Sequence, residues 1–187
     1  MEELSRGPSR VAEELLRLGV TSAVKEMPES TRTAVEAAAA LGCDVAQIVK
    51  SLIFRSVVGD EALLVLVSGA DRVDEPRLAE VVGEQVVKAT GNFVRARTGY
   101  AIGGVPPVGH TQHVVTYLDE HLLDHGLVWA AAGSPRAVFP IKPADLLRIT
   151  SAKVVAVAAA QVPAAAPQVP AAAAQVPAAD AQVPAVN

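Results

Sequence analysis

Glycine and proline are concentrated in residues 98–110 of this chain, which read T-G-Y-A-I-G-G-V-P-P-V-G-H. Glycine has no Cβ to keep another group away from the backbone, and it adopts positive φ readily. Pro106 and Pro107 fix φ and have no N–H of their own. We therefore expect a stiff loop in which the N–H groups of Gly103 and Gly104 are free to bind carboxylate, phosphate or ester oxygens. A connection that simply needs tight turns is the alternative.

One lysine interrupts the apolar segment 48–54, I-V-K-S-L-I-F. Alternate residues of a strand share a face, so Lys50 stands between Ile48 and Leu52. Its ammonium either reaches solvent along the apolar stem or meets an anion, because an unpaired buried charge is costly. The first alternative is an ordinary strand-end lysine. The second places one cation on a rigid element at the rim of a pocket.

The histidines suggest a metal only weakly. His121 and His125 stand one helical turn apart and have acidic neighbours, an arrangement that could ligate zinc. The string E-H-L-L-D-H fits a solvated helix face equally well, and the sequence indicates no fixed third ligand. We expect no metal and no cofactor. His110 ends the Gly/Pro loop, but no partner that would make it a general base is evident, and P-loop, dinucleotide and nucleophilic-serine motifs are absent.

Local patterns predict the elements that position these residues. Thr33 and Glu36 form a capping-box pattern, Asp74 with Pro76 begins a helix, and a turn at Gly59 and Asp60 joins two apolar strands into an antiparallel hairpin. Helices are predicted at 9–18, 34–41, 75–82, 91–97, 119–125 and 143–147, and strands at 23–27, 48–54, 61–68, 85–88, 114–118, 127–132, 137–141 and 153–157. This order predicts an α+β fold with a mixed, mainly antiparallel sheet, curled toward a partial barrel with helices around it.

Composition divides the chain into one domain, 1–157, and a tail, 158–187. The tail repeats Q-V-P-A every seven residues from Gln161, and we expect it to be disordered because it cannot bury enough apolar surface. The net charge of −4 gives no basic field to hold a long nucleic acid, although contact with one end of an RNA stays open. A single cysteine, Cys43, fits a reducing compartment. No signal peptide or apolar spanning stretch is evident, so we expect a soluble cytoplasmic protein without a membrane partner.

Several segments, in this order, resemble the YbaK/prolyl-tRNA synthetase-associated family of aminoacyl-tRNA editing domains. They are I-V-K-S-L-I-F at 48–54, V-L-V-S-G-A-D-R-V-D at 65–74, T-G-Y-A-I-G-G-V-P-P-V-G at 98–109, A-A-G at 131–133 and P-A-D-L at 143–146. Each segment alone is weak evidence, whereas the ordered set is specific. The resemblance covers roughly residues 20–157 and leaves the tail unmatched.

The resemblance implies an enzyme, an aminoacyl-tRNA deacylase that acts in trans. It would hydrolyse the ester between a wrong, small amino acid, such as alanine or cysteine, and the 3′ end of a proline tRNA. The expected catalytic residues are Lys50, Gly103 and Gly104: the lysine would hold the phosphate or ribose of the terminal adenosine, and the loop N–H groups would stabilise the oxyanion. The expected substrate-binding residues are Lys50, Thr98, Gly99, Tyr100, Gly103, Gly104, Val105, Pro106, Pro107 and His110.

Two other functions remain open from the sequence. Many family members have a small polar residue where this chain has Pro106, which leaves the substrate open. This difference concerns the substrate and not the class of reaction. A separate alternative is a non-catalytic module of the same fold that binds tRNA ends or a synthetase, and a synthetase partner is in any case compatible with the resemblance. A metal-dependent hydrolase that uses His121 and His125 is the third alternative.

Overall fold

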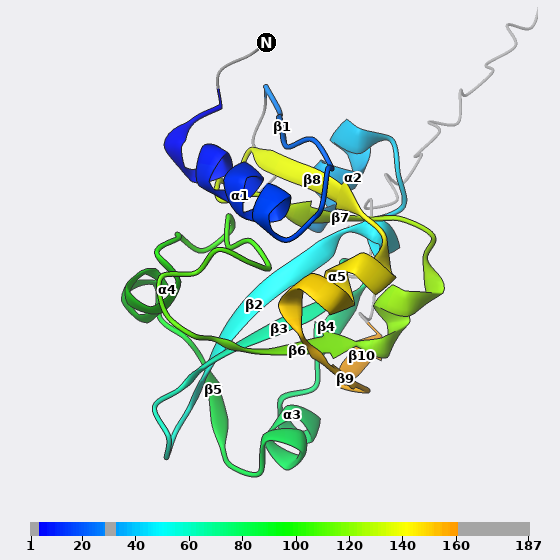
Figure 1. Cartoon of the computed structure of the whole chain (residues 1–187). Coiled ribbons are helices and arrows are strands. Elements are labelled where there is room, and N and C mark those ends of the chain that lie inside the picture. The colour runs from blue at the N-terminus through cyan, green and yellow to red at the C-terminus, as the bar shows by residue number, and fades with distance from the viewer. Residues whose placement is uncertain (1–3, 29–32, 161–187) are drawn as a thin grey trace, which may run out of the picture.

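The computed structural model describes residues 4–28 and 33–160. Its helices are α1 (Arg6–Arg17), α2 (Ala34–Leu41), α3 (Glu75–Val82), α4 (Gly91–Thr98) and α5 (Pro143–Thr150), with 3₁₀ turns η1 (Val45–Gln47) and η2 (Glu120–Asp124). Its strands are β1 (Lys25–Glu26), β2 (Val49–Ser56), β3 (Ala62–Ser68), β4 (Asp71–Val73), β5 (Val86–Lys88), β6 (Val115–Asp119), β7 (Val128–Ala131), β8 (Ala137–Ile141), β9 (Lys153–Val155) and β10 (Ala158–Ala160). Figure 1 shows their arrangement.

The described strands form three sheets. A five-stranded sheet has the order β5-β2-β3-β6-β9, a second has the order β1-β8-β7, and β10 pairs with β4. The pairs β3–β6 and β6–β9 are parallel and the others are antiparallel. In Figure 1 the β1-β8-β7 sheet and α1 lie above the five-stranded sheet, and α3 lies at its other end, beside β5. The predicted α+β class with a mixed, mainly antiparallel sheet is confirmed, and the sheets do not close into a barrel.

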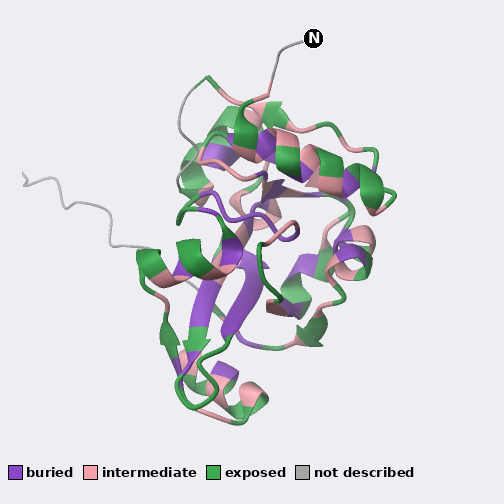
Figure 2. Ribbon diagram, turned by 60° about the vertical axis from the view of Figure 1, so that its left-hand side comes forward, coloured by how far each residue is buried: buried purple, intermediate pink, exposed green. Residues whose placement is uncertain are grey.

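The core fills both faces of the five-stranded sheet. Val49 and Ile53 of β2 pack in one apolar cluster together with Val105, whereas Leu52 and Phe54 pack on the other face. Every residue of the central strand β3 is buried, as expected for a strand with apolar residues on both of its faces. Figure 2 shows these buried strands at the centre of the molecule, beneath helices whose outer faces are exposed.

The local sequence patterns correctly predict where α2 and α3 begin and which strands form the hairpin. The Thr33 hydroxyl accepts a hydrogen bond from the Glu36 N–H at 3.1 Å, and the Glu36 carboxylate accepts one from the Thr33 N–H, so the predicted capping box begins α2. The Asp74 side chain accepts a hydrogen bond from the Arg77 N–H at 3.1 Å and so caps the start of α3. The hairpin of β2 and β3 is confirmed, with Val49 opposite Ser68.

Three expectations were wrong in detail. The first helix begins at Arg6 rather than residue 9. Residues 71–73 form β4, where a turn into a helix was expected. Residues 158–160 form β10 against β4, so the predicted disordered tail does not begin at 158, and the rest of that prediction lies outside the described residues. Among the described residues, no helix is both long and apolar enough to cross a membrane.

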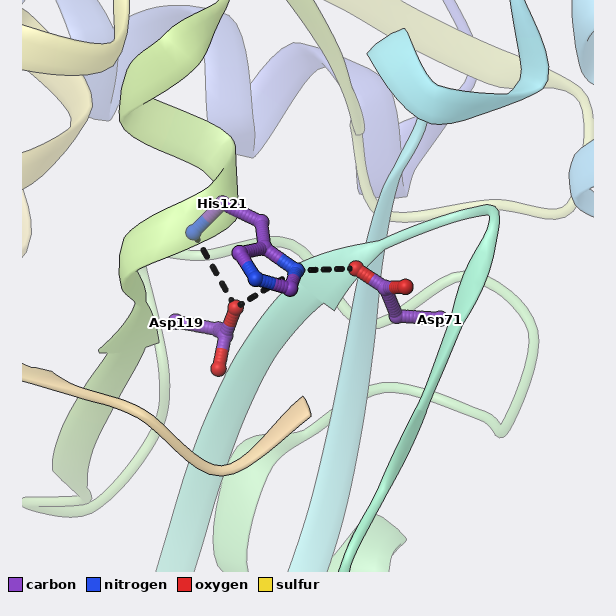
Figure 3. A group of neighbouring side chains, drawn as sticks. All are labelled: Asp71, Asp119 and His121. Atoms are coloured by element: carbon purple, nitrogen blue, oxygen red, sulfur yellow. Dashed lines mark hydrogen bonds and ion pairs between the residues drawn. The ribbon is translucent and has the colours of Figure 1, made fainter. Parts of the chain in front are cut away.

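A buried carboxylate ties β6 to the last two strands. Asp119 is fully buried, and its Oδ2 accepts hydrogen bonds from the N–H groups of Val157 and Ala158 at 2.8 and 2.7 Å. Its Oδ1 accepts a third from the N–H of His121 at 3.1 Å. The Nδ1 of His121 lies 2.9 Å from Oδ2 of Asp71, so the imidazole stands between two carboxylates (Figure 3). We call Asp71, Asp119 and His121 the clamp.

We predict that Asp119→Ala lowers the free energy of unfolding by about 3 kcal/mol, because it leaves buried N–H groups without an acceptor and each such group costs about 1–3 kcal/mol. Urea unfolding followed by circular dichroism measures the change. The control is Asp124→Ala, which truncates an exposed carboxylate of the neighbouring η2. Equal midpoints for the two variants would contradict the role of the clamp.

The clamp also predicts a pH dependence of stability. The hydrogen bond to Asp71 raises the pKa of His121 above its ordinary value. The folded chain therefore binds this proton more tightly, so the stabilisation is complete below the ordinary pKa and is lost as pH rises through the raised pKa. Because the His121 side chain is 52% exposed, we expect a change of less than about 1 kcal/mol.

The measurement is the urea midpoint of the wild-type chain, His121→Gln and His113→Gln at pH 5.5 and 8.5. His121→Gln should reduce the loss of stability between the two pH values. His113→Gln, which changes an exposed histidine outside the clamp, should keep the wild-type loss. The same pH dependence in all three proteins would show that another group is responsible.

Candidate functional site

A cleft of about 540 Å³ runs along the edge of β2. Its walls are residues 48–54, the start of α2, residues 102, 103 and 105 of the Gly/Pro loop, and parts of β7, β8 and the turn between them. Many of the wall residues have small side chains: Ala34, Ala37, Ala89, Ala131, Ser134 and Ala137. A volume of this size accommodates a small molecule or the end of a larger one.

The cleft exists because β2 has one unpaired edge. On one side β2 pairs with β3 from Val49 to Arg55. On the other side β5 pairs only with Phe54–Ser56. Among the described residues, positions 50–52 have no partner strand on that second edge, so the Gly/Pro loop and the β7–β8 hairpin can face it directly.

Gly103 contributes a backbone N–H to the cleft. It has a φ of +88°, lines the cleft, and its N–H has no hydrogen-bond partner among the described residues. The N–H of Val105, a second wall residue, likewise has none within the described part of the chain. The sequence predicts free donors at Gly103 and Gly104, whereas in the described structure the N–H groups without a partner are those of Gly103 and Val105.

Gly104 has a different role from the one expected. Its N–H donates to the Ala101 carbonyl at 3.1 Å, so the prediction of a free donor at Gly104 is wrong. A Cβ at this position would lie 2.7 Å from the backbone carbon of Ser134. Glycine is therefore needed at position 104 so that the loop can pack against the β7–β8 turn. Gly104 thus has a packing role in the wall of the cleft.

Lys50 lines the cleft, and its ammonium is neither in open solvent nor paired with a carboxylate. The side chain is half-buried, and Nζ donates to the backbone carbonyl of Asp71 in β4. Burial lowers the pKa of Lys50, and the nearby Asp71 opposes that change. Lys50 therefore lies on a rigid strand at the cleft, as the second alternative expected, and in this structure a carbonyl oxygen accepts from its ammonium.

The remaining loop residues support the cleft from outside it. The Thr98 hydroxyl donates to the Val94 carbonyl at 2.7 Å and accepts from the Tyr100 N–H at 3.1 Å. The Tyr100 hydroxyl donates to the Gly109 carbonyl at 3.2 Å, and its ring is buried. Gly99 ends α4 with a φ of +82°. None of these residues lines the cleft, so their place in the structure is the packing of the loop.

Pro106, Pro107 and His110 belong to the Gly/Pro loop but, like the residues above, do not line the cleft. Both prolines are buried, and Nε2 of His110 lies 2.8 Å from the Pro106 carbonyl oxygen. Burial lowers the pKa of His110, which favours the neutral imidazole as a donor to that carbonyl. His110 therefore braces the loop, and the structure does not bring it to the cleft with Lys50 and Gly103.

Sequence reasoning missed Ser51. By the alternation of a strand it shares a face with Val49 and Ile53, opposite to that of Lys50, and it lines the cleft. Its Oγ is the one buried side-chain oxygen or nitrogen in the described part of the chain that has no hydrogen-bond partner. An unsatisfied buried hydroxyl costs about 1–3 kcal/mol. The signal was a hydroxyl within an otherwise apolar strand face.

The residues of the cleft do not match a metal centre. Its described walls contain no Asp, Glu, His or Cys. Three potential ligand atoms do lie within 4.8 Å of one another in the clamp, but there the carboxylate of Asp119 already accepts backbone N–H groups and His121 bonds to Asp71 (Figure 3). His125, considered from the sequence as a second ligand beside His121 although no metal is expected, does not belong to this group.

The chain matches known proteins over most of its described length. A model of the aminoacyl-tRNA editing domain matches residues 28–149. A solved structure of a candidate trans-editing enzyme for prolyl-tRNA synthetase is 48% identical, with a TM-score of 0.79, and the match covers 83% of this chain and 98% of that one. Protein YwhH of Bacillus subtilis, which is uncharacterized, is 31% identical over 70% of this chain and 83% of its own.

EbsC of Enterococcus faecalis, named as a candidate Cys-tRNA(Pro)/Cys-tRNA(Cys) deacylase, is 24% identical over 71% of this chain and 81% of its own length. The family match begins after β1 and runs from α2 into α5, so it includes Lys50, the Gly/Pro loop and the β7–β8 hairpin, which contribute to the walls of the cleft. The chain belongs to the family of aminoacyl-tRNA editing domains.

Proposed function

We propose that this chain is a trans-editing deacylase that hydrolyses the ester of a small amino acid wrongly attached to a tRNA, with a proline tRNA as its substrate. The observation that carries the proposal is that Lys50 and Gly103, whose N–H has no hydrogen-bond partner among the described residues, line the same cleft, whose walls are rich in alanine. Names given to similar proteins, a trans-editing enzyme and a deacylase, support this class of reaction.

The loop N–H groups would supply the catalytic stabilisation. Water attacks the ester carbonyl carbon, the carbonyl oxygen becomes an oxyanion, and the N–H groups of Gly103 and Val105 donate to it. Each such donor is worth about 3 kcal/mol of transition-state stabilisation. The intermediate then releases the ribose oxygen, which takes the proton that the water loses. An aminoacyl ester is already reactive, so turnover does not require a carboxylate or imidazole base, and the described walls contain neither.

Lys50 would bind the terminal nucleotide. Its ammonium donates to a neutral carbonyl, and a phosphate oxygen as acceptor would add the attraction between two opposite charges. A phosphate or ribose oxygen at the mouth of the cleft can therefore replace the Asp71 carbonyl as the acceptor. The strand fixes the lysine backbone, so the nucleotide would be held in one register relative to the loop.

Selectivity would come from the size of the cleft. One methylene changes binding by only about 1–3 kcal/mol, so a synthetase that activates a smaller amino acid by mistake needs a second check that excludes the correct, larger one. The short side chains of Ala89, Ala131 and Ala137 leave space in the cleft for the side chain of a small amino acid. Proline, the cognate amino acid, would be rejected by its ring.

A non-catalytic binding module of the same fold is the second candidate. One observation favours it: the N–H of Gly104 is already bonded to Ala101, so one of the two glycine donors expected for an oxyanion is not available. Such a module would bind the acceptor end of a tRNA, or a synthetase, without hydrolysing the ester.

We predict that Lys50→Ala reduces deacylation of a mischarged tRNA at least tenfold while the fold is retained, since it removes the only ammonium on this strand. A panel of tRNAs charged with alanine, serine, cysteine or proline is incubated with the full chain, and the loss of the ester is measured. Lys142→Ala, on the exposed residue before α5, is the matched control and should keep the wild-type rate.

The same panel separates the candidate functions. Hydrolysis of at least one small-amino-acid ester by the wild-type chain supports the deacylase, and binding without hydrolysis supports the module. An unchanged rate in Lys50→Ala would contradict the role of the lysine. A rate that chelators leave unaffected would eliminate the metal-dependent alternative that uses His121 and His125.

The structure also predicts the effect of a single methyl group at Gly104. Gly104→Ala places a Cβ against the Ser134 backbone, so the loop must shift and the N–H groups of Gly103 and Val105 move with it. We expect a loss of deacylation of at least tenfold. Gly126→Ala, whose Cβ would meet nothing within 4 Å, should have little effect on the rate. Equal rates for the two variants would show that the loop position does not matter.

A further inference from the structure

The hydroxyl of Ser51 is an exception among the buried hydroxyls of the main sheet. Ser68, at the end of β3, donates to the Ala46 carbonyl at 3.0 Å and accepts from the Ala70 N–H at 3.2 Å. Ser56, at the end of β2, accepts from the Glu61 N–H at 3.1 Å. The Oγ of Ser51 is buried and has no partner within residues 4–28 and 33–160. The fold thus satisfies the other two serines and leaves this one without a hydrogen bond.

The position of Ser51 suggests what its partner would be. It lines the cleft in the middle of the β2 segment that has no partner strand, two residues from both Val49 and Ile53 on the same face. The side chains of Val49 and Ile53 belong to the apolar cluster that also contains Val105. A ligand that enters between β2 and the loop therefore lies against the strand position that carries this one buried hydroxyl, in an apolar surrounding.

The ester carbonyl and the ammonium of an aminoacyl group are poor candidates for that partner. In the proposed function the carbonyl oxygen is bound by the loop N–H groups. The ammonium is charged, and the described walls around Ser51 contain no carboxylate to compensate for its loss of hydration. The side chain of a small amino acid can bring a hydroxyl or a thiol into an apolar cleft, and the hydroxyl is the stronger hydrogen-bond donor and acceptor of the two.

We infer that Ser51 is a specificity-determining residue that hydrogen-bonds the side-chain hydroxyl of the misacylated amino acid, so that the cleft prefers a seryl or threonyl ester to an alanyl ester. The inference rests on the proposed function, because it identifies the amino acid edited at that site. A site with a buried polar group disfavours the analogue that lacks the matching hydroxyl, since the protein group is then left unpaired.

The experiment compares seryl and alanyl esters of the same tRNA with the wild-type chain, Ser51→Ala and Ser51→Thr. The wild-type chain should hydrolyse the seryl ester at least tenfold faster than the alanyl ester, measured as kcat/KM. Ser51→Ala should reduce this ratio at least tenfold, chiefly by slowing seryl hydrolysis. Ser51→Thr, which keeps the hydroxyl, should retain a preference for serine. A wild-type preference for alanine, or an unchanged ratio in Ser51→Ala, would overturn the inference.

Stability provides a second readout that separates recognition from a structural role. Ser51→Ala removes a hydroxyl without a partner in the described chain, so its urea midpoint should equal or exceed that of the wild-type chain. Ser56→Ala, the same truncation in the same strand, removes a satisfied hydroxyl and should lower the midpoint while leaving the seryl-to-alanyl ratio unchanged. A lower midpoint for Ser51→Ala would show that the hydroxyl supports the fold instead.

Binding of non-hydrolysable compounds separates failure of this inference from failure of the proposed function. The probes are adenosines that carry a seryl or alanyl group in a 3′ amide linkage, and the measurement is their Kd. A chain that hydrolyses no ester but binds the seryl probe at least tenfold more tightly, with that preference lost in Ser51→Ala, would refute the deacylase and support the specificity. Equal binding of the two probes by the wild-type chain would refute the specificity.

Discussion

The unpaired edge of β2 is the constraint on which the candidate site depends. A central strand normally bonds on both sides, and β2 does so only where β5 joins it at Phe54–Ser56. Upstream of that point the strand edge forms the floor of a cleft, and the Gly/Pro loop and the β7–β8 hairpin form its walls. If β5 extended along the whole of β2, it would occupy the space that the ligand needs. The short length of one edge strand therefore makes room for the site.

The supports of the cleft are polar contacts within an apolar frame. Thr98, Tyr100 and His110 each use a side-chain hydrogen bond to a backbone carbonyl or N–H to fix the shape of the loop. On the other face of β2, Lys50 is bonded to β4, whose Asp71 carboxylate bonds to His121 of the clamp. The clamp thus fixes β4, whose Asp71 carbonyl accepts a hydrogen bond from Lys50. Asp71 therefore takes part both in stabilising the fold and in positioning the lysine that we propose binds the nucleotide.

Much of the fold follows from local patterns in the sequence. The capping box at Thr33, the cap at Asp74 and the hairpin of β2 with β3 are all confirmed, because each depends on residues that are close in the chain. The strand β4 and its pairing with β10 were missed. The three residues of β10 are all alanine and carry no strand signal of their own. They form a strand because they pair with β4, which is distant in the sequence.

The same distinction applies to the site. Lys50, Gly103 and Val105 were predicted from composition and resemblance, and the structure places them around one cleft. The partner of Lys50 and the engaged N–H of Gly104 depend on tertiary contacts that no spacing rule reveals. Ser51 was overlooked because its importance lies in a missing hydrogen bond, which only the folded chain exhibits.

The most direct test of the account is an NMR titration of the ¹⁵N-labelled full chain with a non-hydrolysable 3′-aminoacylamide adenosine. The account predicts that the backbone N–H signals of Gly103 and Val105 shift most, in the direction of stronger hydrogen bonding, together with signals from Lys50 and Ser51. Shifts confined to α1 and His110, with the loop N–H groups unchanged, would contradict it.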